Sequence, residues 1–138
     1  MAAFRTHRRV EFRDTDAAGI VHFSAFFPMM EAAEHEMLRS LGIAVMPRPS
    51  DGSDPLTWPR ISAQCDYRAA AYFEDILEID VRVAKIGSTS VQYEFSFSRA
   101  SLAIAQGRIT AVCCRLTPTG LVKTPVPEEH RQLLQKHV

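Results

Sequence analysis

The residues best suited to chemistry lie in a short segment near the start of the chain. Residues 14–21 read DTDAAGIV, so two aspartates precede a glycine that permits a tight backbone path. A helical pattern begins shortly afterwards, near Ser24, and the free N–H groups at a helix start carry partial positive charge. The Asp16 carboxylate could therefore attack an electrophile or activate water, while a backbone N–H stabilises the developing oxyanion.

Other interpretations of these residues remain open. Aspartates before a helix are often turn formers or caps, so spacing alone also permits a structural role for Asp14 and Asp16. His22 could serve as a general base, but a single histidine is more often packed against backbone, and no Ser or Cys nucleophile follows it in a nucleophile-elbow context. We expect His22 to line the site at most.

The helix following this segment carries several glutamates. Glu34 and Glu36 are expected on a solvated helix face. Glu31 follows Phe27 by four residues and should share its largely apolar face, where a buried carboxylate would need a hydrogen-bond partner.

Metal and cofactor chemistry has little support in the sequence. The five histidines and three cysteines show no spacing typical of a metal site, and there is no glycine-rich phosphate loop. Cys65, Cys113 and Cys114 are an odd number, and two of them are adjacent, which argues against a disulfide framework and favours a reducing compartment. We expect no metal, no separate cofactor and a cytoplasmic location.

The composition restricts the class of partner. The 138 residues, 46% of them hydrophobic, suit a single domain over 1–138. Sixteen basic residues balance sixteen acidic ones, so no net charge attracts nucleic acid or an anionic membrane. No run of eighteen apolar residues occurs, and the first ten residues lack the apolar core of a signal peptide. The expected partners are small molecules or copies of the chain itself.

Hydrophobic periodicity predicts the elements that must position the acidic segment. Alternation predicts a first strand over residues 6–13, with Val10 and Phe12 on one face. A helical spacing of apolar residues then extends from Ser24, expected as the N-cap, to Gly42, which is placed to stop the helix. After a loop rich in Pro, Gly and Ser at 43–57, alternation predicts four strands over 61–67, 77–83, 91–97 and 104–117, and a short helix over 128–135.

This order favours an α+β fold in which one antiparallel sheet of about five strands wraps around one long helix. Small or apolar residues fall on both faces of the last strand over 111–114. That pattern indicates that sheets from two chains meet, and hence a homo-oligomer.

Residues 10–27, VEFRDTDAAGIVHFSAFF, resemble the signature of the 4-hydroxybenzoyl-CoA thioesterase family, which has the hot-dog fold. The resemblance covers nearly the whole chain, continuing through residues 31–33, 38–42, 65–70, 75–79 and 88–91.

The resemblance implies an acyl-CoA thioesterase in which Asp16 is the nucleophile or general base. It places the oxyanion-holding backbone N–H at Phe23 or an adjacent residue such as Ser24, and it gives Gly19 the task of allowing close approach of the thioester. It implies that acyl-CoA, a substrate rather than a cofactor, binds between subunits of a homodimer or a tetramer built as a dimer of dimers.

For the CoA nucleotide, the resemblance implies contacts from Thr89 and Ser90 in the turn before the fourth predicted sheet strand. The residues that meet the phosphates are not assigned by it. Charge alone offers four candidates: Lys85, Arg99, Arg108 and Lys123.

Two departures leave the acyl group open. Many relatives have Tyr-His where this chain has His22-Phe23, and an arginine where this chain has Glu34. Aryl-CoA substrates, such as 4-hydroxybenzoyl-CoA or 1,4-dihydroxy-2-naphthoyl-CoA, and short-chain acyl-CoA both fit. The alternatives are a thioesterase for acyl-carrier protein, which the neutral net charge disfavours, and a hot-dog protein that binds acyl-CoA without turnover. A hydratase is disfavoured because no histidine and aspartate pair can be placed.

Overall fold

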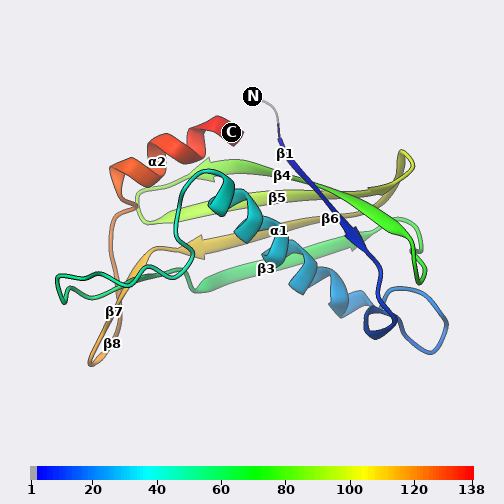
Figure 1. Cartoon of the computed structure of the whole chain (residues 1–138), viewed down its shortest axis with the longest axis horizontal. Coiled ribbons are helices and arrows are strands. Elements are labelled where there is room, and N and C mark those ends of the chain that lie inside the picture. Colours follow the sequence, from blue (N-terminus) through cyan, green and yellow to red (C-terminus); the bar gives the residue numbers. More distant parts are fainter. Residues whose placement is uncertain (1–2) are drawn as a thin grey trace.

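The computed structural model describes residues 3–138. A five-stranded sheet, with strand order β1-β4-β5-β6-β3 and every neighbouring pair antiparallel, wraps around the long helix α1 (Figure 1). The helix covers Phe26–Ser40, and the strands are β1 (Phe4–Arg9), β3 (Arg60–Tyr67), β4 (Ile76–Ile86), β5 (Ser90–Arg99) and β6 (Leu102–Val112). The predicted α+β arrangement of one sheet around one helix is confirmed.

The inner face of the sheet follows the alternation in the sequence. In β5 the side chains of Tyr93, Phe95 and Phe97 are buried, and the residues between them lie on the other face. Phe95 is paired with Val81 and Phe97 with Ile79 on β4, so large apolar side chains stand side by side beneath the helix. These cross-strand pairs form the centre of the core.

Helix α1 lies close to the sheet because β6 has a glycine at the crossing. Met30, which is fully buried, packs directly over Gly107. A Cβ at position 107 would collide with the sulfur of Met30 and would also lie 3.2 Å from the carbonyl oxygen of Gln64. The missing side chain therefore fixes the distance between helix and sheet.

The two ends of the helix were predicted with unequal success. Ser24 is not the N-cap: Phe23–Ala25 form a 3-10 turn, η2, that runs into α1, and His22 caps this turn by accepting a hydrogen bond from the Ser24 N–H at 3.2 Å. Gly42 does end the helix, with φ +79°, while the Ile43 N–H bonds to the Leu38 carbonyl at 2.9 Å.

The first strand is shorter than predicted. β1 ends at Arg9, and although Val10 is buried, Phe12 is 79% exposed. The chain leaves the sheet because the Glu11 N–H donates to the Asp14 carboxylate at 2.8 Å, which closes the short 3-10 turn η1 (Phe12–Asp14). The prediction of a strand through residue 13, with Phe12 on its inner face, is wrong.

The last predicted strand is divided at Cys113. The Cys113 N–H donates to the Thr89 carbonyl at 2.7 Å, and β6 does not continue through this residue. The chain then enters a second antiparallel sheet, which projects at the lower left of Figure 1. This sheet contains β2 (Leu56–Thr57), β7 (Cys114–Thr117) and β8 (Gly120–Lys123), the last of which was not predicted. The C-terminal helix α2 (Glu128–Leu134) and the turn η3 (Gln135–His137) lie where a short helix was predicted.

The residues that suggested an oligomer are covered by their own chain. Ala111, Cys113 and Cys114 are all buried in the single chain, so their small or apolar character needs no second copy. Two of the exposed apolar side chains lie on the edge strand β3, where Ile61 is 66% and Tyr67 48% exposed.

Candidate active site

The acidic segment forms a compact hairpin-like loop. The Asp16 N–H donates to the Ile20 carbonyl at 2.8 Å, and Thr15 and Val21 form an antiparallel bridge. Gly19 closes the loop with φ +84°, a conformation that favours glycine, and its N–H donates to the Asp16 carbonyl at 3.0 Å. The predicted role of Gly19 in a tight backbone path is confirmed.

Both arms of this loop are fixed to their surroundings. The Val21 N–H donates to the Ala71 carbonyl and the His22 N–H to the Asp14 carbonyl, each at 2.8 Å. Ile20 also bridges to Tyr72, in the segment just before β4. The loop is therefore held against the segment that leads into β4, and the backbone around Asp16 is preorganised.

The Asp16 carboxylate has one restrained and one available oxygen. Oδ1 accepts the Ala18 N–H at 2.8 Å, whereas none of the hydrogen bonds formed within residues 3–138 uses Oδ2. The side chain lines a cavity of about 380 Å³ together with Phe23, Phe26, Tyr67 and others. A residue with an available carboxylate oxygen thus lines a cavity whose wall also includes three aromatic residues, several small apolar ones and Arg68.

Phe23 contributes both a wall and a possible donor. It occupies the first position of η2, where an N–H has no partner inside the helix, and no acceptor for this N–H occurs among the described residues. Its carbonyl oxygen accepts the Tyr67 hydroxyl at 2.9 Å, which fixes the peptide on its C-terminal side. A carboxylate, a free N–H and apolar walls are the groups that acyl transfer requires.

His22 and Ser24 lie on the other side of the loop. They line a separate cavity of about 530 Å³ with Arg8, Arg13 and Asp14, and not the cavity that contains Asp16. The His22 Nδ1 is engaged by the Ser24 hydroxyl at 2.7 Å. Of the predicted site residues, the structure therefore brings Asp16 and Phe23 together in one cavity and directs His22 and Ser24 away from it.

The expectations for two helix glutamates are reversed. The Glu31 side chain is 54% exposed, whereas Glu34 is buried and pairs with Arg60, whose Nη1 donates to Oε2 at 3.0 Å and whose Nη2 lies 2.9 Å from Oε1. Burial raises the pKa of Glu34, and the Arg60 charge opposes that rise. The signal was in the sequence: Glu34 follows Met30 by four residues and precedes Met37 by three, and both methionines are core.

Thr89 and Ser90 lie at the opposite end of the sheet from the Asp16 loop. The whole length of β4 lies between this turn and the Asp16 loop. With eleven residues at 3.3 Å each, the strand is about 36 Å long. Within one chain they cannot share a small substrate with Asp16, so their predicted contact with CoA stays a prediction that requires a second subunit. Two of the basic candidates are already in ion pairs, Arg99 with Asp75 at 2.7 Å and Arg108 with Glu94 at 2.9 Å.

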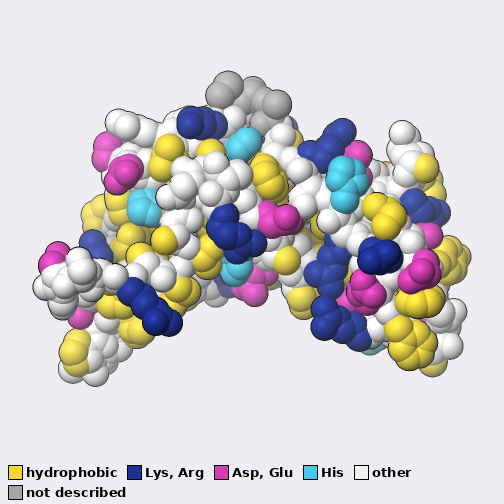
Figure 2. Space-filling model, viewed as in Figure 1, with side chains coloured by type: hydrophobic (Ala, Val, Ile, Leu, Met, Phe, Trp, Pro, Cys, Tyr) yellow, Lys and Arg dark blue, Asp and Glu magenta, His cyan; other side chains and the backbone are white. Residues whose placement is uncertain are grey.

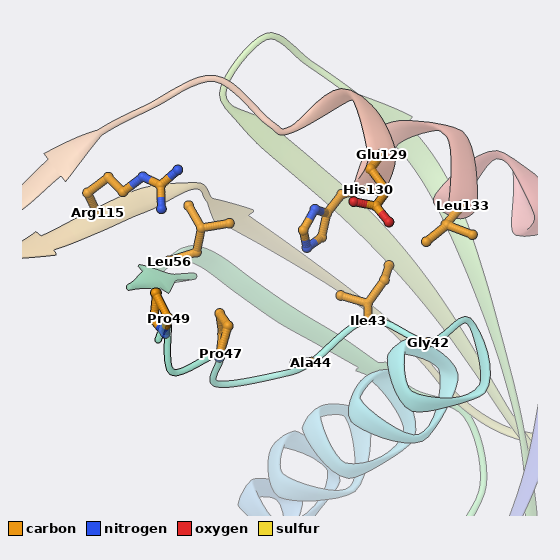
Figure 3. Close-up of a pocket in the computed structure, with 10 residues that line it drawn as sticks. All are labelled: Gly42, Ile43, Ala44, Pro47, Pro49, Leu56, Arg115, Glu129, His130 and Leu133. Carbon is orange, nitrogen blue, oxygen red and sulfur yellow. The ribbon is translucent and has the colours of Figure 1, made fainter. Parts of the chain in front are cut away.

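Another cavity, of about 210 Å³, lies between the segment after α1 and helix α2. Figure 3 shows His130 and Leu133 reaching into it from α2, opposite Ile43 and Pro47. The His130 Nδ1 is buried and finds no hydrogen-bond partner among residues 3–138, and burial lowers the pKa of this imidazole. No residue of the Asp16 loop lines this cavity, so we do not assign the predicted chemistry to it.

The described part of the chain contains neither a metal-binding cluster nor a membrane-spanning helix. Between residues 3 and 138, no three His, Cys, Asp or Glu side chains are grouped as a metal ion would require. None of the helices formed by the same residues has the length and apolar character needed to cross a membrane.

Comparison with known proteins identifies the family to which the chain belongs. The model of the family described as the thioesterase superfamily matches residues 18–104, which include Gly19, helix α1 and most of the large sheet. The chain belongs to the thioesterase superfamily. The prediction of a thioester hydrolase is thereby confirmed at the level of the family, while the narrower assignment to the 4-hydroxybenzoyl-CoA thioesterases stays a prediction.

Relatives of this superfamily member extend over almost its whole length. A 1,4-dihydroxy-2-naphthoyl-CoA hydrolase from Synechococcus elongatus is 27% identical over 135 residues, covering 98% of this chain and 97% of that protein. The solved structure of a gentisyl-coenzyme A thioesterase superposes with a TM-score of 0.79 at 27% identity, covering 95% of this chain and 99% of the other. That of a 1,4-dihydroxy-2-naphthoyl-CoA thioesterase from Synechocystis gives 0.84 at 24% identity, with 96% of each chain covered. The predicted hot-dog fold is confirmed.

Proposed function

We propose that this protein hydrolyses acyl-CoA thioesters at the cavity lined by Asp16. The observation that supports this most directly is that Asp16 lines the cavity with only one carboxylate oxygen, Oδ1, held by a hydrogen bond, from the Ala18 N–H, among the described residues 3–138. Membership in the thioesterase superfamily supplies the reaction class.

Two routes use the same carboxylate. As a nucleophile, Oδ2 attacks the thioester carbonyl carbon, the C–S bond breaks, and CoA leaves as the thiolate. Water then hydrolyses the mixed anhydride, which releases the acid and regenerates the Asp16 carboxylate, and a proton set free in that step converts the thiolate to the thiol. As a general base, Asp16 takes a proton from the water that attacks the carbonyl, and the proton passes to the leaving sulfur. In both routes the Phe23 N–H donates to the oxyanion.

We propose an aryl group as the preferred acyl moiety, with short acyl chains as the alternative. Phe23 and Tyr67, which line the cavity and are exposed, offer aromatic surface to a flat ring. The buried Phe26 supports Tyr67, with 5.5 Å between the two ring centroids. The relatives named above are hydrolases of 1,4-dihydroxy-2-naphthoyl-CoA and gentisyl-CoA, both of which carry aryl groups.

We also propose that the active protein is a homodimer, alone or paired as a tetramer, with the cavity at the subunit interface. Strand β3 is an edge of the sheet, and Ile61 and Tyr67 on it are exposed. Tyr67 also lines the Asp16 cavity, so a second copy along β3 would cover its open side. Such a copy could bring Thr89 and Ser90 of the partner subunit to the CoA.

Sedimentation should give a multiple of the 15.5 kDa chain, and a monomer that retains full activity would contradict the arrangement.

The test is Asp16→Asn, assayed by thiol release from a panel of aryl-CoA and aliphatic-CoA thioesters. Asparagine keeps an oxygen for the Ala18 N–H, so the loop should persist, while turnover should fall by about a hundredfold or more. The matched control is Asp54→Asn, in an exposed loop. Undiminished turnover in the Asp16 variant would overturn the mechanism, and wild-type binding without any thiol release would favour a non-catalytic binding protein.

A further inference from the structure

The cavity of about 210 Å³ between helix α2 and the segment after α1, here called the α2 cavity, has a mainly apolar wall. Its apolar side chains come from the segment after α1, from β2 and from α2: Ile43, Ala44, Pro47, Pro49, Leu56 and Leu133. Figure 2 shows hydrophobic side chains gathered over this part of the surface. A cavity of about 150 Å³ with an apolar lining can take up benzene. The α2 cavity is therefore large enough for a six-membered ring with a small substituent.

His130 supplies a polar group inside this apolar wall. Figure 3 shows the tip of its ring, which carries Nε2, directed from α2 into the cavity. The other ring nitrogen, Nδ1, is buried, and neither nitrogen has a hydrogen-bond partner within residues 3–138. Because no protein group determines which nitrogen carries the hydrogen, Nε2 can present either a donor or an acceptor to a molecule in the cavity.

The charges in the wall of the α2 cavity cancel. Burial lowers the pKa of His130, so its ring is neutral at about pH 7.5. The other two ionisable residues of the wall are Arg115 and Glu129, which carry opposite charges. The Arg115 Nη1 already donates to the Asp54 carbonyl at 2.9 Å. A neutral molecule is therefore favoured over an ion, because burial of an ion without a matching charge is costly.

Water alone would fill the α2 cavity poorly. At about 30 Å³ each, about seven water molecules would be needed, and a buried water requires two to four polar partners. The wall has only three polar side chains, and the other residues that line it are Gly, Ala, Ile, Leu and Pro. One organic molecule with a single polar group matches this wall better than a cluster of waters does.

We infer that the α2 cavity is a binding site for a small, uncharged ring compound with one hydroxyl group, such as a phenol. The ring would pack against Pro47 and Leu133, and the hydroxyl would form a hydrogen bond with Nε2 of His130. A hydroxyl suits this position because it can both donate and accept, whichever nitrogen of the imidazole carries the hydrogen. The inference does not depend on the proposed function, since the fifteen residues of α1, about 22 Å of helix, lie between this cavity and Phe23.

The first arm of the test locates the ligand. The wild-type protein is titrated at pH 7.5 with phenol while the NMR signals of its methyl groups are followed. Signals of Ile43 and Leu133, which line the α2 cavity, should shift with a Kd of roughly 1 mM, a usual affinity for a ligand of this size. Signals of Ile20 and Val21 report on the Asp16 cavity. Shifts confined to those two residues, or none at up to about 10 mM phenol, would overturn the site.

The second arm tests the contact with His130. His130→Phe keeps a ring of similar size and removes both nitrogens. Its Kd for phenol should rise about fivefold, the effect of one hydrogen bond, whereas its Kd for toluene, which has a methyl in place of the hydroxyl, should not rise. His35→Phe is the matched control, since His35 is also half-buried but lines a different cavity, and it should leave both Kd values unchanged. An equal change for phenol and toluene in His130→Phe would exclude the hydroxyl contact.

A third arm tests the cavity and the class of ligand. Ala44→Trp places a large ring at the cavity wall from an exposed position, so it should fold and abolish the binding of phenol and toluene alike. Unchanged binding in this variant would place both ligands elsewhere. Benzoate should bind the wild type at least about tenfold more weakly than phenol, because it brings an unmatched charge. Tighter binding of benzoate would show that the site takes anions through Arg115 and would overturn the neutral class. A failure of the wild type to hydrolyse thioesters would refute the proposed function and leave these results unaffected.

Discussion

The Tyr67 hydroxyl donates a hydrogen bond to the Phe23 carbonyl oxygen at 2.9 Å, although the two residues are 44 positions apart. Tyr67 is the last residue of the edge strand β3, and Phe23 opens the turn that leads into α1. This bond therefore ties the end of β3 to the peptide that follows Phe23, next to the N–H proposed to hold the oxyanion. The Phe26 ring packs beside Tyr67, with 5.5 Å between the ring centroids.

Tyr67→Phe should lower kcat about fivefold and leave the fold intact. It keeps the ring and removes only the hydroxyl, and a hydrogen bond of this kind contributes about 1 kcal/mol. Because the backbone of Phe23, whose N–H is proposed to bind the oxyanion, would be less well fixed, the loss should appear in kcat more than in KM. Steady-state kinetics of thiol release test this. Tyr72→Phe is the control, and an equal effect in both variants would exclude a role for the Tyr67–Phe23 bond.

How far the sequence predicts this site depends on the range of the interaction concerned. The Asp16 loop was predictable because glycine preference and the following helix start are local signals. The Tyr67–Phe23 bond was not, since nothing in strand periodicity says where the end of β3 meets the helix. The sequence allows His22 as a general base, but in the structure its ring caps η2 by accepting a hydrogen bond from the Ser24 N–H.

The same limit explains the errors in the elements. Alternation continues through Val10 and Phe12, but the Asp14 carboxylate captures the Glu11 N–H and turns the chain out of the sheet. Strand periodicity also runs through Cys113, where a bond to the Thr89 carbonyl ends β6. In each case a single contact that the pattern does not encode ends an element that the pattern would continue.

Gly107→Ala should destabilise the protein by about 1–3 kcal/mol, the usual range for overpacking a filled core. The added methyl would meet the Met30 sulfur on α1 and crowd the Gln64 carbonyl. Urea denaturation followed by circular dichroism measures the change. In a chain that already carries Met30→Ala, the methyl added at position 107 should cost less stability, so the effects of the two substitutions should be non-additive. Simple additivity would contradict the direct contact.

Arg60→Met should destabilise the protein by about 3 kcal/mol at pH 7, because it leaves the buried Glu34 carboxylate without its cation. Burial already raises the pKa of Glu34, and removal of the Arg60 charge would raise it further. The folded variant then binds a proton at a higher pH than the unfolded chain does. Its stability should therefore be greatest at acid pH and decline as the pH rises through that folded-state pKa.

Urea midpoints of the Arg60 variant between pH 4.5 and 7.5 measure this slope. Arg82→Met is the control, since Arg82 is 57% exposed and pairs with Glu94 at the surface, where the expected loss is about 0–1 kcal/mol. Adding Glu34→Leu should restore much of the stability at pH 7 by removing the buried charge. A flat pH profile for Arg60→Met would show that Glu34 is not the group left unpaired.

His130 should make the wild-type protein less stable as the pH falls below about 6.5, the ordinary pKa of histidine. Burial lowers the pKa of the folded imidazole, with a smaller opposing effect from Glu129. In the window below 6.5 the unfolded chain takes up a proton that the folded chain does not, so acidification favours unfolding. Burial lowers the pKa of His35 as well, so both histidines contribute in the same direction. Thermal melts at pH 7.5, 6.5 and 5.5 should show a shallower decline in His130→Gln than in the wild type. Identical slopes in the wild type and the His130 variant would show that the buried Nδ1 does not impose neutrality on this ring.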